Sequence, residues 1–369
     1  MTERIILASP REPCGATWLI NCLLALGIKT YRVGPLGQKM WLKDSNGWNL
    51  DRREEVLKKW LPVLSQRKHF QFNDQLEVQW LHEWPTAADW QHRVMYFIRD
   101  PRDAMYSRYR REGASMPFKD YLDFPDAFSL LDKIDHWRAF NESWLEHPRM
   151  QVVRFEDYKA NALQLLKQTM DWIGFPTSEP ALEVACAASS FEKAAQAERQ
   201  YLQNNGGGQL INRAGKSGEW RTLSCEADVM EKISVHCAHA LRFFGYEAPA
   251  GETADLRNRP QFSRLRYFAS IRLPVPMQQV TCSDDDRLRA LIEKLDANLL
   301  QAAGMTDSET HVMLDRLVEY ARAAGWRHSV RQLDQLYRAL GITKATRWSN
   351  QKVRLRRVIS QLLRAVANR

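Results

Sequence analysis

The chain has 369 residues, 44% hydrophobic and 26% charged, which is an ordinary composition for one folded α/β domain with a smaller appendage. No run approaches the roughly 18 apolar residues of a membrane-spanning helix, and Ile5–Leu7 is too short for a secretory signal. We therefore expect cytoplasmic residence. The formal net charge of +9 lies in residues 261–369, with 19 basic and 10 acidic residues, so the first 260 residues are neutral.

Three short apolar runs predict buried strands: Ile5–Ser9, Val94–Ile98 and Gln151–Phe155. A helical pattern follows each of them, as in Leu163–Ile173 after the third. Strands that alternate with helices at this spacing favour a central parallel sheet with helices on both faces. The sequence therefore predicts an α/β fold, followed by a flexible glycine-rich loop at 204–208.

The C-terminal third has a different pattern. Residues 249–283 form a proline-containing connector between a domain at 1–248 and a basic helical region at 284–369. Helices are predicted at Arg287–Leu300, Asp307–Ala324, Ser329–Leu340 and Ser349–Ala367. Thr306 or Asp307 caps the second helix, with Glu309 in its first turn.

The six cysteines are scattered, with no C-x-x-C pair and no histidine at zinc-finger spacing. This pattern argues against a structural zinc site and against a disulfide framework. We expect free thiols and no metal.

Anion-binding features occur in three separate segments. Residues 10–18 join the first strand to a helix N-terminus, where backbone N–H groups favour an anion, but the Walker form with its lysine is absent. Arg99 closes the second strand, with Ser107 eight residues later, which places a guanidinium fork and a hydroxyl near one helix start. Residues 213–221 combine glycines with cations, as a phosphate-binding loop does.

These segments resemble, in family order, sulfotransferases that use 3′-phosphoadenosine-5′-phosphosulfate (PAPS), over roughly residues 5–246. Cys14–Leu19, read as C-G-A-T-W-L, is similar to S-G-T-T-W-L in the family's phosphosulfate loop. Pro13 stands where the family has lysine, and Arg11 is the nearest cation, as though two residues were inserted. The resemblance therefore implies that Arg11 supplies the charge at the bridging oxygen.

The same resemblance assigns the remaining PAPS contacts. Arg99 and Ser107 match the family's 3′-phosphate pair, and 213–221 matches its R-K-G-x-x-G-D-W-K segment with Ala214 for the lysine. Phe155 and the Ser189–Phe191 segment match positions near adenine, and Trp18 adds a ring there. The implied PAPS and PAP (3′-phosphoadenosine-5′-phosphate) contacts are Arg11, Cys14, Gly15, Ala16, Thr17, Trp18, Arg99, Ser107, Phe155, Ser189, Phe191, Arg213, Ala214 and Gly215.

Sulfuryl transfer needs a base at the acceptor. The family's histidine segment, K-T-H-x-P, is similar to residues 80–85, which makes His82 the candidate base. Glu83 is the alternative, since some carbohydrate-modifying relatives use glutamate. Imidazole is better tuned to neutral pH than a carboxylate, which favours His82.

The acceptor, a hydroxyl or less favourably an amine, is not identified by the sequence. The tryptophans between Trp41 and Trp90 could stack on a sugar or on a flat aromatic acceptor, or they could belong to the hydrophobic core. The tail Lys344–Arg369 has 8 basic residues, no acidic residue and an apolar stripe. It could lie on an anionic membrane at the inner face, bind a polyanion or pack on its own domain. We expect no specific nucleic-acid partner.

Two alternatives to a PAPS-dependent sulfotransferase remain. The changes at Pro13, Ala16 and Ala214 are compatible with an inactive relative that binds a nucleotide or polyanion. An unusual phosphotransferase is disfavoured by the missing Walker lysine and by the second phosphate site at Arg99 and Ser107.

Overall fold

The structure is a computed structural model of the whole chain. The residues that it describes are 2–32, 72–82, 84–85, 89–127, 129–145, 147–204, 210, 215–223, 226–250 and 283–341. Most of the predicted connector, the glycine run, the fourth C-terminal helix and the basic tail lie outside this part. Within the described ranges, no helix combines the length and apolar character needed to cross a membrane.

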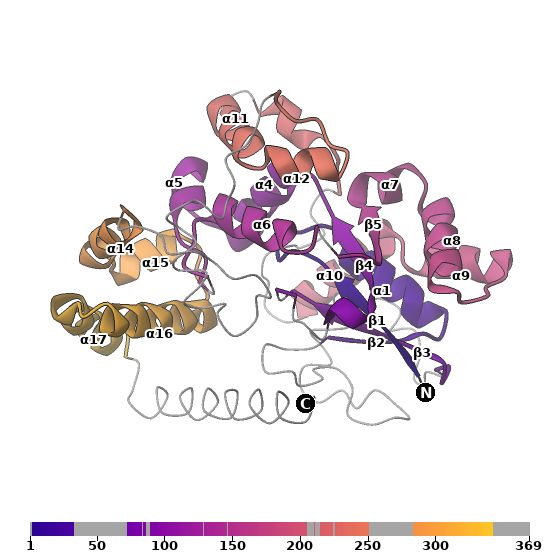
Figure 1. Cartoon of the computed structure of the whole chain (residues 1–369), viewed down its shortest axis with the longest axis horizontal. Coiled ribbons are helices and arrows are strands. Elements are labelled where there is room, and N and C mark those ends of the chain that lie inside the picture. The colour runs from indigo at the N-terminus through magenta and orange to yellow at the C-terminus, as the bar shows by residue number, and fades with distance from the viewer. Residues whose placement is uncertain are drawn as a thin grey trace.

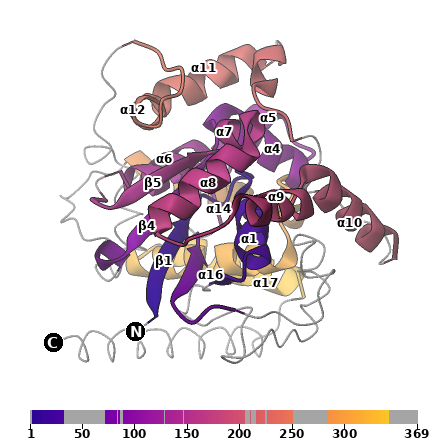
Figure 2. The ribbon, with the colours of Figure 1, turned by 90° about the vertical axis from the view of Figure 1, so that its right-hand side faces the viewer.

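A five-stranded parallel sheet in the order β2-β3-β1-β4-β5 forms the centre of the fold (Figures 1 and 2). Its strands are β1 (Glu3–Ala8), β2 (Lys29–Arg32), β3 (Leu76–Leu81), β4 (Arg93–Ile98) and β5 (Met150–Arg154). The central strand β1 pairs with both neighbours in parallel register, with Ile5 opposite Val78 on one side and Arg93 on the other. The predicted α/β fold is therefore confirmed.

The three predicted strands correspond to β1, β4 and β5, although Phe155 begins a helix instead of ending its strand. Neither β2 nor β3 is predicted from the sequence. The first reads K-T-Y-R and the second L-E-V-Q-W-L, so their polar side chains break the apolar run expected of a buried strand. Polar side chains of the two strands form hydrogen bonds with each other: the Tyr31 hydroxyl of β2 donates to Glu77 Oε1 of β3 at 2.8 Å.

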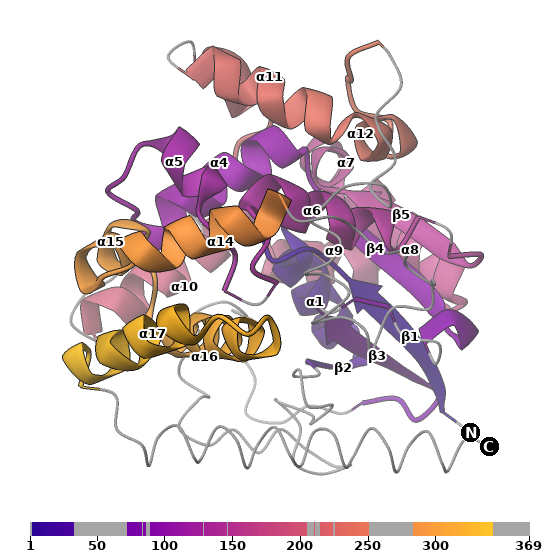
Figure 3. The ribbon, with the colours of Figure 1, turned by 60° about the vertical axis from the view of Figure 1, so that its left-hand side comes forward.

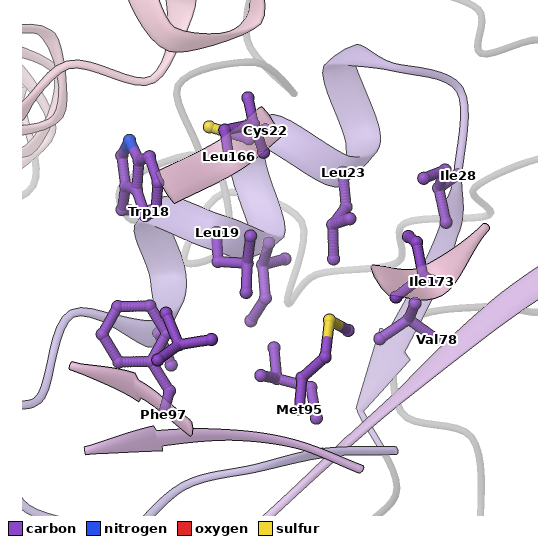
Figure 4. Packing of buried hydrophobic residues seen from close by; sticks show 14 of the residues in the cluster. Trp18, Leu19, Cys22, Leu23, Ile28, Val78, Met95, Phe97, Leu166 and Ile173 are labelled. Atoms are coloured by element: carbon purple, nitrogen blue, oxygen red, sulfur yellow. The ribbon is translucent and has the colours of Figure 1, made fainter. Parts of the chain in front are cut away.

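Helices cover both faces of the sheet because alternate side chains of each strand point to opposite sides. Ile5, Leu7 and Phe97 face one core, whereas Ile6 and Tyr96 face the other. The first core is covered by α1 (Ala16–Ala25), α8 (Ala162–Ile173) and α9 (Glu179–Ala188) (Figure 4). The second is covered by α4 (Pro101–Glu112), α6 (Lys133–Glu142), α11 (Ala227–His236) and α12 (Ala238–Phe243).

This part of the chain contains five further helical elements in its described residues. They are η1 (Asp89–Gln91), α5 (Phe118–Asp123), α7 (Phe155–Ala160), α10 (Phe191–Asn204) and η2 (Glu219–Thr222).

The C-terminal region contains α14 (Ser283–Lys294), α15 (Ala297–Ala302), α16 (Asp307–Ala323) and α17 (Arg327–Ala339). The prediction of one helix over Arg287–Leu300 was wrong, because Asp296 accepts a hydrogen bond from the Leu299 N–H and starts a new helix. Of the two caps that the sequence allowed, Thr306 and Asp307, the structure has Thr306, in a reciprocal capping box with Glu309.

These four helices, which we call the C-terminal helical unit (residues 283–341), pack beside α4 and α5 (Figure 3). Phe124, Ala127 and Leu130, which follow α5, share one apolar core with side chains from α14 to α17. The N–H groups of Ser115 and Met116 donate to the Ala302 carbonyl at 2.9 and 3.3 Å. The unit is thus anchored on the sheet-containing part of the chain by both apolar and backbone contacts.

Gly304 tests this anchoring. It has φ +70°, and a Cβ there would lie 2.5 Å from the Glu112 carbonyl oxygen, whereas Gly325 has φ +74° with nothing within 4 Å of such a Cβ. Gly325→Ala should lower the free energy of unfolding by about 1–2 kcal/mol, because alanine is strained in the left-handed backbone conformation. Gly304→Ala should lower it by about 1–3 kcal/mol more, because the new Cβ also clashes with the Glu112 carbonyl. Denaturant unfolding followed by circular dichroism measures the stability of both variants. Equal losses of stability in the two variants would contradict the close packing of Gly304 against Glu112.

Candidate active site

A cavity of about 470 Å³ opens where β1, β3 and β4 end. Every sequence-predicted site residue that the structure describes lines this cavity. These residues are Arg11, Cys14, Gly15, Ala16, Thr17, Trp18, His82, Arg99, Ser107, Phe155, Ser189, Phe191 and Gly215. The other three, Glu83, Arg213 and Ala214, lie outside the described residues.

The loop after β1 enters the cavity and leads into the N-terminus of α1. Gly15 precedes the helix with φ +93°, and a Cβ at this position would lie 2.8 Å from Cδ2 of Phe155. Only glycine fits that combination of backbone and space. The first turn of α1 therefore borders the cavity, as an anion-binding helix start requires.

Cys14 lies in the same loop and is buried. Burial raises the pKa of its thiol to about 11, so the sulfur is protonated at neutral pH. A thiolate nucleophile at this position is therefore not supported.

Arg99, the first residue after β4, connects three segments around the cavity. Its Nη2 donates to the Lys216 carbonyl at 2.7 Å and its Nη1 to the Pro13 carbonyl at 3.3 Å. Its guanidinium carbon lies 4.6 Å from the centroid of the Phe155 ring. The side chain is 5% exposed, and its buried Nε has no hydrogen-bond partner among the described residues. Arg99 therefore retains an unused donor beside the cavity.

The segment from Gly215 to Trp220 is fixed against α4. The N–H groups of Gly218 and Trp220 donate to the two carboxylate oxygens of Asp103 at 2.7 and 2.9 Å. Gly215 has φ +57°, and a Cβ there would lie 2.8 Å from Cε2 of Phe191. This glycine brings the segment's backbone against an aromatic ring that also lines the cavity.

Aromatic side chains form a further wall of the cavity. The rings of Trp18 and Tyr158 stack with centroids 4.2 Å apart and an interplanar angle of 25°. Phe155 meets Tyr158 edge-on at 5.8 Å. Sequence reasoning missed Tyr158, since a tyrosine in the Phe155–Ala160 helix has no motif that distinguishes it from a core residue.

His82 follows β3 directly and lies beside the end of β1. Its Nδ1 is 2.8 Å from the Ser9 carbonyl oxygen, which can only accept, so Nδ1 carries the proton and Nε2 is the unprotonated nitrogen. Trp80 supports this arrangement: its Nε1 donates to Ser9 Oγ at 3.0 Å, and its ring meets the His82 ring edge-on at 4.6 Å.

The pKa of His82 is lowered well below its ordinary value of 6.5, mainly by burial and further by the positive charges of Arg32, Arg11 and Arg111. The imidazole is therefore neutral at neutral pH. A neutral imidazole with an unprotonated Nε2 can accept a proton.

Arg108 anchors the loop to α4, a role that sequence reasoning did not predict. It pairs with Glu12 of the loop at 2.7 Å, with Glu112 at 2.7 Å and with Asp126 at 3.1 Å. Glu12 is 2% exposed, so the apparent two-residue insertion at residues 12 and 13 folds inward.

The tryptophans of the Trp41–Trp90 segment divide by position. Trp80 lines the cavity. Trp84 packs against Phe140 at 5.5 Å, and Trp90 stacks on His147 at 5.0 Å, so these two belong to the packing around the second core. Trp41, Trp48 and Trp60 lie outside the described residues.

Known proteins were compared with the chain by sequence and by structure. No curated protein matches it in sequence. Similar solved structures include retinol dehydratase with retinol and PAP (17% identity, TM-score 0.43, covering 67% of this chain and 83% of that one). Another is mouse sulfotransferase SULT7A1 with PAP (13% identity, TM-score 0.40, covering 65% and 84%). The sulfotransferase domain family matches residues 4–245. The chain therefore belongs to the sulfotransferase domain family, whose enzymes transfer a sulfuryl group from PAPS.

Proposed function

We propose that this chain binds PAPS across the cavity and transfers its sulfuryl group to a hydroxyl acceptor, with His82 as the base. The observation that carries the proposal is the shared cavity. The loop at residues 14–18 and the Arg99–Ser107 pair come from different strands, yet both line the same 470 Å³ space. Two anion-binding elements on one cavity suit a ligand with phosphate groups at both ends.

The donor side of the cavity is built for an adenosine with two phosphates. Backbone N–H groups at residues 14–18 would hold the 5′-phosphosulfate. Arg99 and Ser107 would hold the 3′-phosphate, and the unpartnered Nε of Arg99 is a donor that an anion would satisfy. Trp18, Phe155, Ser189 and Phe191 would border adenine. Arg213, Ala214 and Gly215, which match the family's third segment, complete the proposed set of PAPS-binding residues.

The transfer breaks the bond between sulfur and the bridging oxygen and forms one between sulfur and the acceptor oxygen. His82 Nε2 takes the proton of the acceptor hydroxyl. Arg11 and the N-terminus of α1 stabilise the negative charge that develops on the bridging oxygen. An amine acceptor would need the same base, and a hydroxyl is preferred. Glu83 remains the alternative base.

Binding of the product PAP tests the donor site. Arg99→Ala should weaken PAP binding about tenfold or more, because a charge-assisted phosphate contact is worth roughly 1.5–3 kcal/mol. Arg110→Ala, exposed on the helix α4 that follows Arg99, is the control and should bind PAP as the unchanged chain does. Titration calorimetry without Mg²⁺ measures both.

If Arg99→Ala binds PAP normally, Arg99 is not part of the site. If the unchanged chain binds PAP only when Mg²⁺ is present, the phosphotransferase alternative gains support. Binding of PAP without any transfer from PAPS to a broad acceptor panel would favour the inactive relative.

Substitution of the base separates catalysis from binding. His82→Ala should keep PAP affinity and lower kcat about 100-fold or more. Without the imidazole, the protein has no base at this position to take the proton of the substrate hydroxyl. His239→Ala, an exposed histidine on α12, should leave kcat unchanged. Transfer of labelled sulfate from PAPS measures the rate; normal turnover in His82→Ala would shift the assignment to Glu83.

The lowered pKa of His82 predicts an unusual pH profile. A base works in its deprotonated form, so lowering its pKa moves the acidic loss of rate to lower pH. We expect kcat/KM to stay level from pH 8 down through 6.5 and to fall only below that value. A rate that already halves at pH 6.5 or above would argue that a less buried group is the base.

A further inference from the structure

The C-terminal helical unit reaches the active-site cavity, although it lies beyond the family-matched residues 4–245. Glu309, in the first turn of α16, lines the cavity together with His82 and Arg111. The unit is held there by the contacts of Ala302 with Ser115 and Met116 and by the close approach of Gly304 to Glu112. The start of α16 is thereby fixed next to the last turn of α4.

The last turn of α4 belongs to the base side of the cavity. Arg111 lies near enough to His82 for its charge to lower the pKa of that histidine. Arg99 precedes the first residue of α4, and Pro101 and Arg111 are separated along that helix by about 15 Å of helix rise. Glu309, placed beside this turn, is therefore at the end of the cavity away from the Arg99 site.

Glu309 has one carboxylate oxygen in use and one available. Its Oε2 accepts from the Thr306 N–H at 3.1 Å and from the Thr306 hydroxyl at 2.8 Å. Oε1 makes no hydrogen bond to any residue that the structure describes, and the Glu309 side chain is only partly buried. The capping box thus fixes the orientation of the carboxylate while Oε1 can still accept from a ligand.

Charged donors and acceptors occur together at this end of the cavity. Arg11, Arg32 and Arg111 can donate, while Glu309 can accept. Arg32 also lies over the Trp80 ring, 5.4 Å from its centroid. Sugar hydroxyls both donate and accept hydrogen bonds, so they match a lining that contains both kinds of charged group.

We propose that the C-terminal helical unit completes the acceptor site and that Glu309 is a specificity-determining residue for a polyhydroxylated acceptor of the sugar class. This inference rests on the proposed sulfuryl transfer. Glu309 Oε1 accepts a charge-assisted hydrogen bond from a hydroxyl that is not the reacting one, and so orients the sugar toward His82.

Glu309→Gln tests the inference while keeping the capping box, because glutamine also serves as the third helical residue of a capping box. Asp307→Asn, two residues away and exposed, removes the same charge outside the cavity. Labelled-sulfate transfer from PAPS would be measured to glucose, galactose, N-acetylglucosamine and 4-nitrophenol. For the sugar that is used, Glu309→Gln should raise KM about tenfold, with kcat changed less, and Asp307→Asn should match the unchanged chain.

Transfer to 4-nitrophenol should be the same in all three proteins, since this phenol has no second hydroxyl for Glu309. Equal sugar KM values in Glu309→Gln and the unchanged chain would overturn the inference. So would use of 4-nitrophenol with none of the sugars, or PAP binding without transfer to any sugar. Failure of the unchanged chain to bind PAP would instead remove the proposed function itself.

Discussion

The parallel pairing of β3, β1 and β4 is the constraint on which the site depends. Parallel neighbours end at the same edge of the sheet, so whatever follows them is brought together. The loop after β1, His82 after β3 and Arg99 after β4 are far apart in sequence and meet at that edge. The cavity is therefore a consequence of strand order, and the helices serve to hold the three strand ends in place.

Two buried arginines at this edge differ in how their charge is compensated. Arg108 has three carboxylates within 3.1 Å, and it therefore acts as a structural tie between the loop and α4. Arg99 has two carbonyl oxygens and only Asp103 as a carboxylate, at 3.9 Å, with its Nε unpartnered among the described residues. A buried cation with so little compensation gains most from an anionic ligand. This contrast supports Arg99 as a binding residue.

The sequence could predict the features that are local. Apolar runs predicted β1, β4 and β5, and the start of α16 was predicted to lie at Thr306 or Asp307, with Glu309 in the first turn. It could not predict β2, whose polar residues are satisfied by distant partners, or the pairing of Glu12 with Arg108, which joins residues 96 positions apart. The motif residues were predicted through a family resemblance, whereas Tyr158 and Glu309 enter the cavity through tertiary packing that no local pattern records.

The loop that lacks the family lysine is ordered by its own contacts. An insertion that had lost its role would be expected to bulge into solvent, yet Glu12 is buried and bound to Arg108. Turning Glu12 inward leaves Arg11 on the cavity wall, two residues before the position of the missing lysine. These contacts favour a cation shifted along the loop over a binding site that has decayed.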